Sequence, residues 1–197
     1  MILMPSIIEN DGRANKQFDL PSKLFEQNII TCFGEINNDM AYSIITQLLY
    51  LDNKDSDIPI SLYINSGGGS VYDGNAIIDV MRNMNKPVNT VCVGIAMSMG
   101  NQILTAGTGE RRALPNSRIM IHSVASGTQG KIQDMAIDYH ETQYLHDKLM
   151  EDMAKYTKGK TTYEEILKLT DRDNYLSPEE AVEIGLIDKV IYPQNNL

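Results

Sequence analysis

The chain of 197 residues contains only two cysteines and three histidines, and its 17 basic side chains are outnumbered by 26 acidic ones. Two cysteines in apolar runs do not make a disulfide framework and favour a reducing compartment such as the cytoplasm. Because neither cysteine has metal-ligand neighbours, we expect no metal site. Phosphate backbones repel a formal charge of −9, so nucleic acid is not an expected partner.

Long hydrophobic runs are also missing. Two glycines and two side-chain amides interrupt the most apolar window, residues 91–106, which is too short and too polar to span a membrane. The first residues, Met1 to Pro5, lack the basic and apolar regions of a secretory signal. We therefore expect a cytoplasmic protein with no membrane partner. The hydrophobic content of 42% suffices for the core of one ordinary domain.

Short apolar runs alternate with helix-like segments along most of the chain. The runs predict strands at 28–33, 59–64, 88–93, 118–121 and 189–191, with helices at 40–51, 71–84 and 132–155. This alternation is typical of an α/β domain with buried parallel strands. The long helix after residue 131 has a sparse apolar stripe, so we expect it to project towards a partner subunit. Residues 1–27 are polar and predicted to be irregular and mobile unless a partner orders them.

A serine lies where the third predicted strand gives way to a helix-like run. Ser98 is surrounded by small residues in the stretch Gly94–Gly100. The free N–H groups at a helix start can stabilise negative charge, so this position suits a nucleophile. The alternative is that Ser98 only caps the helix that follows.

The glycine run Gly67–Gly69 follows the second predicted strand. It lacks the Lys-Ser/Thr ending of a P-loop and the spacing of a dinucleotide fingerprint. Glycines allow a backbone to approach a ligand closely, so the run could form half of an oxyanion hole or an edge to which a peptide adds as a strand. The alternative is a tight turn between strand and helix.

His122 ends a strand-like run and is the best candidate for a base that activates Ser98, whereas His140 and His146 are expected on the solvated surface of the long helix. The candidates for the acid that orients the imidazole are Asp171 and Asp173, which lie in one loop, and the sequence neither brings this loop to His122 nor chooses between the two acids. The order Ser, His, Asp and the missing G-x-S-x-G motif argue against an α/β-hydrolase.

Six stretches, in the family's own order, resemble the ClpP family, the proteolytic subunits of the Clp ATP-dependent serine protease. They lie at residues 62–70, 94–100, 113–117, 120–122, 170–175 and 180–188. The resemblance implies a ClpP/crotonase fold of repeated ββα units that forms one protease domain over residues 1–197. It also implies an axial N-terminal segment at 1–27 and a handle helix at about 131–156.

Matching motif to motif, the resemblance implies a triad of Ser98 as nucleophile, His122 as base and Asp173 as orienting acid. The implied oxyanion hole consists of the backbone amides of Met99 and Gly69, with Gly68 as the alternative to Gly69. The resemblance further implies that Asp171 and Arg172 make a subunit contact between rings.

The resemblance also implies partners. Family members form two stacked heptameric rings, and a hexameric AAA+ unfoldase of the ClpX, ClpA or ClpC type feeds them unfolded proteins. ATP is used by that unfoldase, so no cofactor is expected in this chain. Four sites depart from the residues usual in the family: Gly67 for proline, Ser123-Val124 for Gln-Pro, Ser126-Gly127 for a double glycine, and Pro21 for tyrosine.

These observations favour a serine endopeptidase that degrades unfolded polypeptides into short peptides. A first alternative is a catalytically weak or regulatory paralogue that acts in a mixed barrel with a second ClpP. A second is an acyl-CoA enzyme of the crotonase type, which shares the fold and an oxyanion hole but needs neither the Ser-His-Asp set nor the projecting helix.

Overall fold

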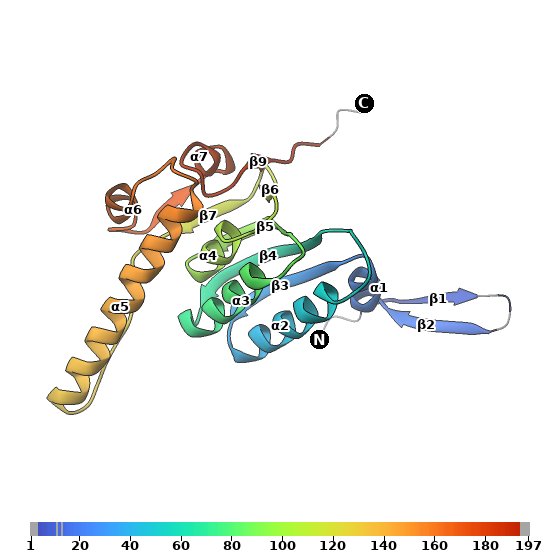
Figure 1. Ribbon diagram of the computed structural model, residues 1–197, viewed down its shortest axis with the longest axis horizontal. Helices are drawn as coiled ribbons and strands as arrows, with labels where there is room; N and C mark the ends of the chain where they lie inside the picture. Colours follow the sequence, from blue (N-terminus) through green and yellow to red (C-terminus); the bar gives the residue numbers. More distant parts are fainter. Residues whose placement is uncertain (1–3, 11, 13, 194–197) are drawn as a thin grey trace.

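A mainly parallel β-sheet forms the centre of the computed structural model, which describes residues 4–10, 12 and 14–193 (Figure 1). Three neighbouring strands, β3 (Ile29–Ile36), β4 (Ile60–Gly69) and β5 (Val88–Met97), run in the same direction. The second and third strands are longer than predicted, since β4 continues through the glycine run and β5 continues to the residue before Ser98. The glycine run is therefore the end of a strand, and its interpretation as a tight turn is wrong.

Four short strands complete this sheet beyond β5. The first half of β5 pairs with β6 (Arg111–Ala113), and its second half pairs with β7 (Arg118–Ile121), both in parallel. β9 (Lys189–Val190) lies parallel to β6, whereas β8 (Asn174–Leu176) is antiparallel to β7. The prediction of an α/β domain with a parallel sheet is confirmed, with β8 as an antiparallel addition.

One face of the sheet packs against α2 (Asn38–Asp52), α3 (Val71–Asn83) and α4 (Met99–Thr105) (Figure 1). The effect of this packing on one face is seen in β4, whose side chains alternate between buried and more exposed positions. This strand is therefore buried on one face and partly exposed on the other. Phe33 on β3 is among the large apolar side chains left exposed, which leaves apolar surface available for contact with another chain.

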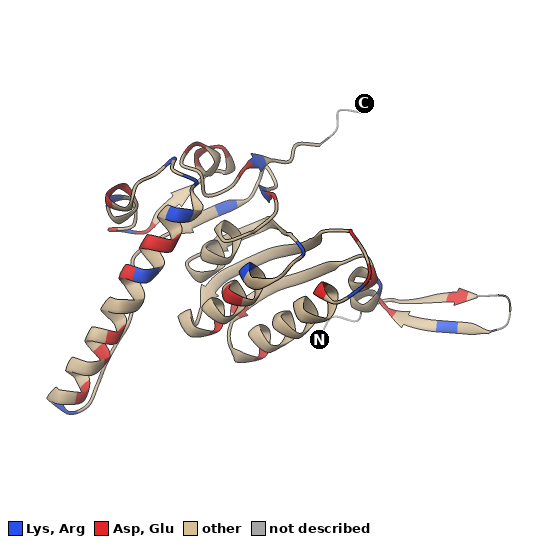
Figure 2. Cartoon of the chain, in the orientation of Figure 1, with Lys and Arg blue, Asp and Glu red and all other residues tan. Residues whose placement is uncertain are grey.

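α5 (Ile132–Tyr156) is the long helix predicted at 131–156, and it extends away from the sheet (Figure 1). Its three buried residues, Leu149, Met150 and Met153, all lie in its last two turns. Figure 2 marks acidic and basic residues along much of its length and few on the central strands. Only the base of α5 thus belongs to the core. α6 (Tyr163–Leu169) packs against α5, whereas α7 (Pro178–Glu183) packs against β7, β8 and β9.

The N-terminal segment is more regular than predicted. β1 (Ser6–Asn10) and β2 (Asn15–Asp19) form an antiparallel hairpin that leads directly into α1 (Leu20–Glu26). The Asp19 carboxylate accepts a 2.8 Å hydrogen bond from the Ser22 amide, which caps this helix. Pro21 does not break the segment, because proline is tolerated in the first turn of a helix. Residues 1–3, 11 and 13 of the segment lie outside the described residues.

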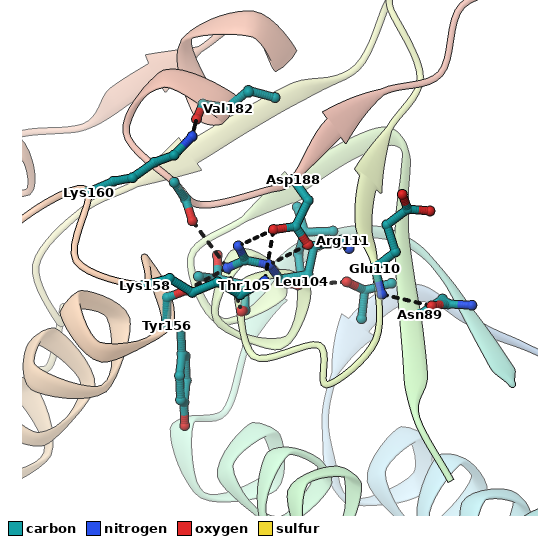
Figure 3. Close-up of polar contacts among 12 residues, drawn as sticks. Asn89, Leu104, Thr105, Glu110, Arg111, Tyr156, Lys158, Lys160, Val182 and Asp188 are labelled. Atoms are coloured by element: carbon teal, nitrogen blue, oxygen red, sulfur yellow. Dashed lines mark hydrogen bonds and ion pairs between the residues drawn. The ribbon is translucent and has the colours of Figure 1, made fainter.

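A buried arginine ties the base of α5 to the rest of the fold (Figure 3). Arg111, with 2% of its surface exposed, forms two hydrogen bonds to the Asp188 carboxylate, at 3.0 Å from Nε and 2.6 Å from Nη2. Its Nη1 donates to the backbone carbonyls of Thr105, Tyr156 and Gly185 at 3.3, 2.6 and 3.1 Å. Helix C-termini leave such carbonyls without intrahelical donors. One guanidinium therefore supplies hydrogen-bond donors to the carbonyls at the ends of α4, α5 and α7.

The same contacts change the acidity of Asp188. Partial burial raises the pKa of a carboxyl group, but here the hydrogen bonds from Arg111 and Lys158 outweigh burial and hold the pKa of Asp188 well below its usual range. The carboxylate therefore stays charged at neutral pH, as its buried arginine partner requires.

Candidate active site

Ser98 lies between the end of β5 and the start of α4. Its φ of 53° and ψ of −124° place it in a left-handed conformation that residues with a side chain rarely adopt. Its amide donates a 3.0 Å hydrogen bond to the carbonyl of Met120 on β7. The Ser98 side chain makes no capping hydrogen bond, and Oγ instead lies 2.8 Å from Nε2 of His122. The alternative interpretation of Ser98 as a simple helix cap is therefore wrong.

His122 follows β7, and strand pairing explains why it reaches Ser98. Met97 and Met120 are register partners in parallel strands, so the residues after β5 and β7 emerge at the same edge of the sheet. The carboxyl edge of a parallel sheet is the usual position of sites in α/β folds. The sequence interval of 24 residues between the serine and the histidine gives no hint of this proximity.

The strand β8 brings a second segment of the chain next to His122. Ile121 pairs with Asn174, which brings the preceding loop beside the imidazole. Oδ1 of Asp173 lies 3.4 Å from Nδ1 of His122, longer than a well-formed hydrogen bond, and the Asp173 side chain is 61% exposed. Asp171 is instead 3.8 Å from Arg172, and both of these side chains are largely exposed. Of the two candidate acids, the structure brings Asp173 to the histidine.

Two backbone amides border the serine. Met99 is the first residue of α4, and the N–H groups of a first helical turn have no intrahelical acceptor. Gly69 ends β4 and lines the same cavity as Ser98 and His122. The Gly68 amide is already engaged, since it donates a 3.1 Å hydrogen bond to Ser66 Oγ. Gly69 is thus better placed than Gly68 to donate to a bound anion.

Close contacts explain the glycines at the end of β4. Gly68 has a φ of +102°, and a Cβ atom there would lie 2.7 Å from Ser98 Cβ and 3.1 Å from Ser98 Oγ. Gly69 has a φ of +152°, and a Cβ atom there would lie 2.1 Å from the carbonyl oxygen of Ile36. Backbone conformation and space therefore both require glycine beside the serine.

We expect Gly68→Ala to slow the reaction of Ser98 with a fluorophosphonate by at least about tenfold, because the added methyl group displaces the serine side chain. Gly67→Ala is the matched control, since a Cβ atom at Gly67 meets nothing within 4 Å. Labelling rates measured by intact mass, with melting temperatures as a check on folding, test the prediction. Equal labelling rates in both variants would show that the close contact does not position the serine.

A cavity of about 220 Å³ opens beside Ser98 and His122. Its wall is mostly apolar and includes the three buried residues at the base of α5: Leu149, Met150 and Met153. Two side chains of α4, Asn101 and Gln102, also line it. The sequence showed these amides only as interruptions of an apolar window, so their place beside the serine was not predicted.

The two remaining histidines differ from each other. His140 is exposed, as predicted. His146 is half-buried, and its Nδ1 accepts a hydrogen bond from the Val124 amide at 3.4 Å, so its prediction as a solvated surface residue is wrong. Val124 occupies the position of the proline that is usual in the ClpP family, and only a residue other than proline can donate this hydrogen bond.

Among the described residues, no three or more His, Cys, Asp or Glu side chains gather as potential metal ligands. Among the same residues, no helix has both the length and the apolar content needed to cross a membrane.

A serine in a strained turn, in contact with a histidine that approaches a carboxylate, is the arrangement of a serine hydrolase on an α/β scaffold. The sequence profile of the Clp protease family matches residues 12–194. The ATP-dependent Clp protease proteolytic subunit of Deinococcus radiodurans is 44% identical over 192 residues, which cover 97% of this chain and 93% of that protein. The chain therefore belongs to the Clp protease family.

Membership of this family confirms the predictions of a ClpP fold and of a serine protease subunit that takes part in ATP-dependent proteolysis. The family also implies oligomeric rings and partnership with AAA+ unfoldases in general. Neither the regulatory alternative nor the acyl-CoA alternative gains support from these comparisons.

Proposed function

We propose that Ser98, His122 and Asp173 are the catalytic triad of this protease. The 2.8 Å contact between Ser98 Oγ and His122 Nε2 carries the proposal, because a serine hydroxyl becomes a nucleophile when a neighbouring base accepts its proton. Asp173, on the opposite nitrogen of the ring, stabilises the imidazolium that forms.

The reaction then follows from the positions of these groups. Ser98 Oγ attacks the carbonyl carbon of the scissile peptide bond while His122 Nε2 accepts the hydroxyl proton. The amides of Met99 and Gly69 donate to the oxyanion of the tetrahedral intermediate. His122 returns the proton to the leaving amine, and water hydrolyses the acyl-enzyme on Ser98 by the same steps.

A groove extends from this centre and fits a peptide backbone. It has a volume of about 390 Å³ and lies between the residues that follow β4 (69–72), the loop 124–127 and the side of α5. An extended chain in this groove could pair with backbone groups on either side, which binds substrate with little demand on its sequence. This geometry suits unfolded polypeptides that are cut into short peptides.

The assembly that we propose is two stacked heptameric rings. Three large apolar side chains on the projecting part of α5 are exposed in the single chain: Ile132, Met135 and Ile137. Together with the exposed pair Asp171 and Arg172, they suit contacts between rings. A hexameric unfoldase of the ClpX, ClpA or ClpC type would deliver substrates and hydrolyse ATP, so this chain requires no cofactor. Two buried free cysteines are in keeping with a cytoplasmic location.

Mass measurement of the purified protein, combined with fluorophosphonate labelling, tests the proposal. We expect a ring assembly in which Ser98 is modified without any other protein. Modification only after a second ClpP is added would support the regulatory alternative. Modification at a residue other than Ser98 would overturn the triad.

We expect Asp173→Asn to lower kcat by about a hundredfold or more, since the imidazolium formed during attack loses its negative partner. The loss should be smaller than for removal of Ser98, because Asp173 is exposed and its contact with His122 is 3.4 Å long. Asp171→Asn is the matched control for peptide turnover in assembled protein. If Asp171→Asn lowered turnover of assembled protein and Asp173→Asn did not, Asp171 would replace Asp173 in the triad.

A further inference from the structure

The cavity beside Ser98 has a polar side, and the proposed reaction does not use it. Asn101 and Gln102 follow the serine on α4, and their surfaces are 0% and 4% exposed. Both line the cavity of about 220 Å³ that Ser98 and His122 also line. Both residues therefore border the space next to the nucleophile, although almost none of their surface is accessible to water.

Each of these amides has a buried polar atom without a hydrogen-bond partner among the described residues. The two atoms are Nδ2 of Asn101 and Oε1 of Gln102. Asn101 Oδ1 accepts a hydrogen bond from Thr105 Oγ1 at 3.2 Å, and Nδ2 is the end of this carboxamide that has no partner. Buried polar groups in native proteins rarely remain unpaired, so an ordered water or a bound group is expected to complete them, and a group that fills the cavity must supply the hydrogen bonds that such a water would make.

The rest of the wall restricts what that group can be. Val71, Leu149 and Met153 are among the apolar side chains that line the cavity. A matching ligand is thus mainly hydrocarbon and ends in one acceptor and one donor. A side-chain carboxamide has this composition. An aliphatic side chain would leave both protein amides unpaired, and a carboxylate would bring an unpaired charge into an apolar cavity.

We propose that this cavity binds the side chain of the residue whose carbonyl Ser98 attacks, and that it prefers glutamine at that position. The proposal rests on the proposed triad. That side chain starts one bond from the attacked carbon, and Ser98 and Gly69 both border the cavity. Asn101 donates to the carboxamide oxygen of the substrate, and Gln102 accepts from its NH₂ group. Asn101 and Gln102 are specificity-determining residues and take no part in the chemical steps.

The test uses internally quenched peptides that differ only in the residue before the scissile bond, with the cut position verified by mass spectrometry. Glutamine is compared with methionine, which has a similar length and no amide, and with glutamate, which is charged. In assembled wild-type protein we expect kcat/KM to be about tenfold higher for glutamine than for methionine, and higher than for glutamate.

Gln102→Met and Asn101→Leu should each bring the ratio of kcat/KM for glutamine to that for methionine close to one. Gln143→Met, at an exposed position on α5, is the matched control and should keep the wild-type ratio. Because the ratio is measured within one protein, a general loss of activity or assembly does not mimic the effect. The wild-type ratio tests the proposal even if a cavity variant does not fold.

The outcomes separate this proposal from the proposed function. A wild-type preference for methionine, with Ser98 still labelled by fluorophosphonate, would overturn the glutamine preference and leave the triad intact. A glutamine preference that Gln102→Met and Asn101→Leu both retain would overturn the roles of these two amides. Absence of both labelling and cleavage would overturn the triad and, with it, this proposal.

Discussion

Replacement of Ser98 by alanine is expected to lower kcat for small fluorogenic peptides by about 10⁴-fold or more, since no other group can form the acyl-enzyme. The assembly should persist, because alanine keeps the Cβ atom of the strained turn and loses only Oγ, whose contact is with His122. Turnover and the mass of the assembly are measured on the same preparation.

Ser43→Ala is the matched control for this experiment. Ser43 is exposed on α2, away from the residues that line the cavity, so its removal should leave turnover close to wild type. Retained turnover in Ser98→Ala would mean that another residue is the nucleophile. Loss of assembly in Ser98→Ala would mean that the serine also has a structural role.

The second large effect concerns stability. We expect Asp188→Ala to lower the free energy of unfolding by about 3 kcal/mol, because it leaves the buried Arg111 guanidinium without its carboxylate partner. The same substitution should lower activity. Arg111 also binds the Tyr156 carbonyl at the end of α5, and Met153 on that helix lines the cavity beside Ser98.

The sign of the pH dependence follows from the depressed pKa of Asp188. A carboxyl group whose pKa is lowered by folding stabilises the protein above its unfolded pKa of about 3.9, and this contribution is lost as the pH falls through the lower folded value. Asp188→Asn should therefore destabilise the protein at neutral pH and remove this part of the acid sensitivity below about pH 4.

Denaturant midpoints at fixed protein concentration, at neutral and acidic pH, measure both effects. Asp152→Asn is the matched control, because its ion pair with Lys148 is solvent-exposed on the lysine side and should contribute less than about 1 kcal/mol. Equal midpoints for the Asp188 and Asp152 variants would show that the buried pair does not hold the base of α5 in place.

The residues of the proposed triad were predictable to different degrees. Ser98 and His122 could be selected from their positions at strand ends, because parallel strands bring such positions to one edge. Asp173 could be selected over Asp171 only through the family resemblance, since both acids lie in one loop. The pairing of Ile121 with Asn174 is what brings Asp173 to the imidazole, and an antiparallel pair of strands 53 residues apart has no local signal.

Other features of the structure could not be predicted from the sequence, for identifiable physical reasons. The N-terminal hairpin has no buried residue in either strand, so it lacks the apolar alternation by which strands are predicted. His146 is half-buried and accepts a hydrogen bond from the Val124 amide, which belongs to a loop 22 residues away. The unpaired atoms of Asn101 and Gln102 are a property of the packed cavity and not of any motif.

The sequence by itself determined the α/β class, the long projecting helix and the serine at the strand end, because periodicity and glycine placement are local properties of the chain. The tertiary structure alone decided that Ser98 binds His122 instead of capping its helix. It also decided that Gly68 must lack a side chain and that Asn101 and Gln102 line the cavity. These features depend on distances between elements far apart in the chain, and packing sets such distances only when the sheet is complete.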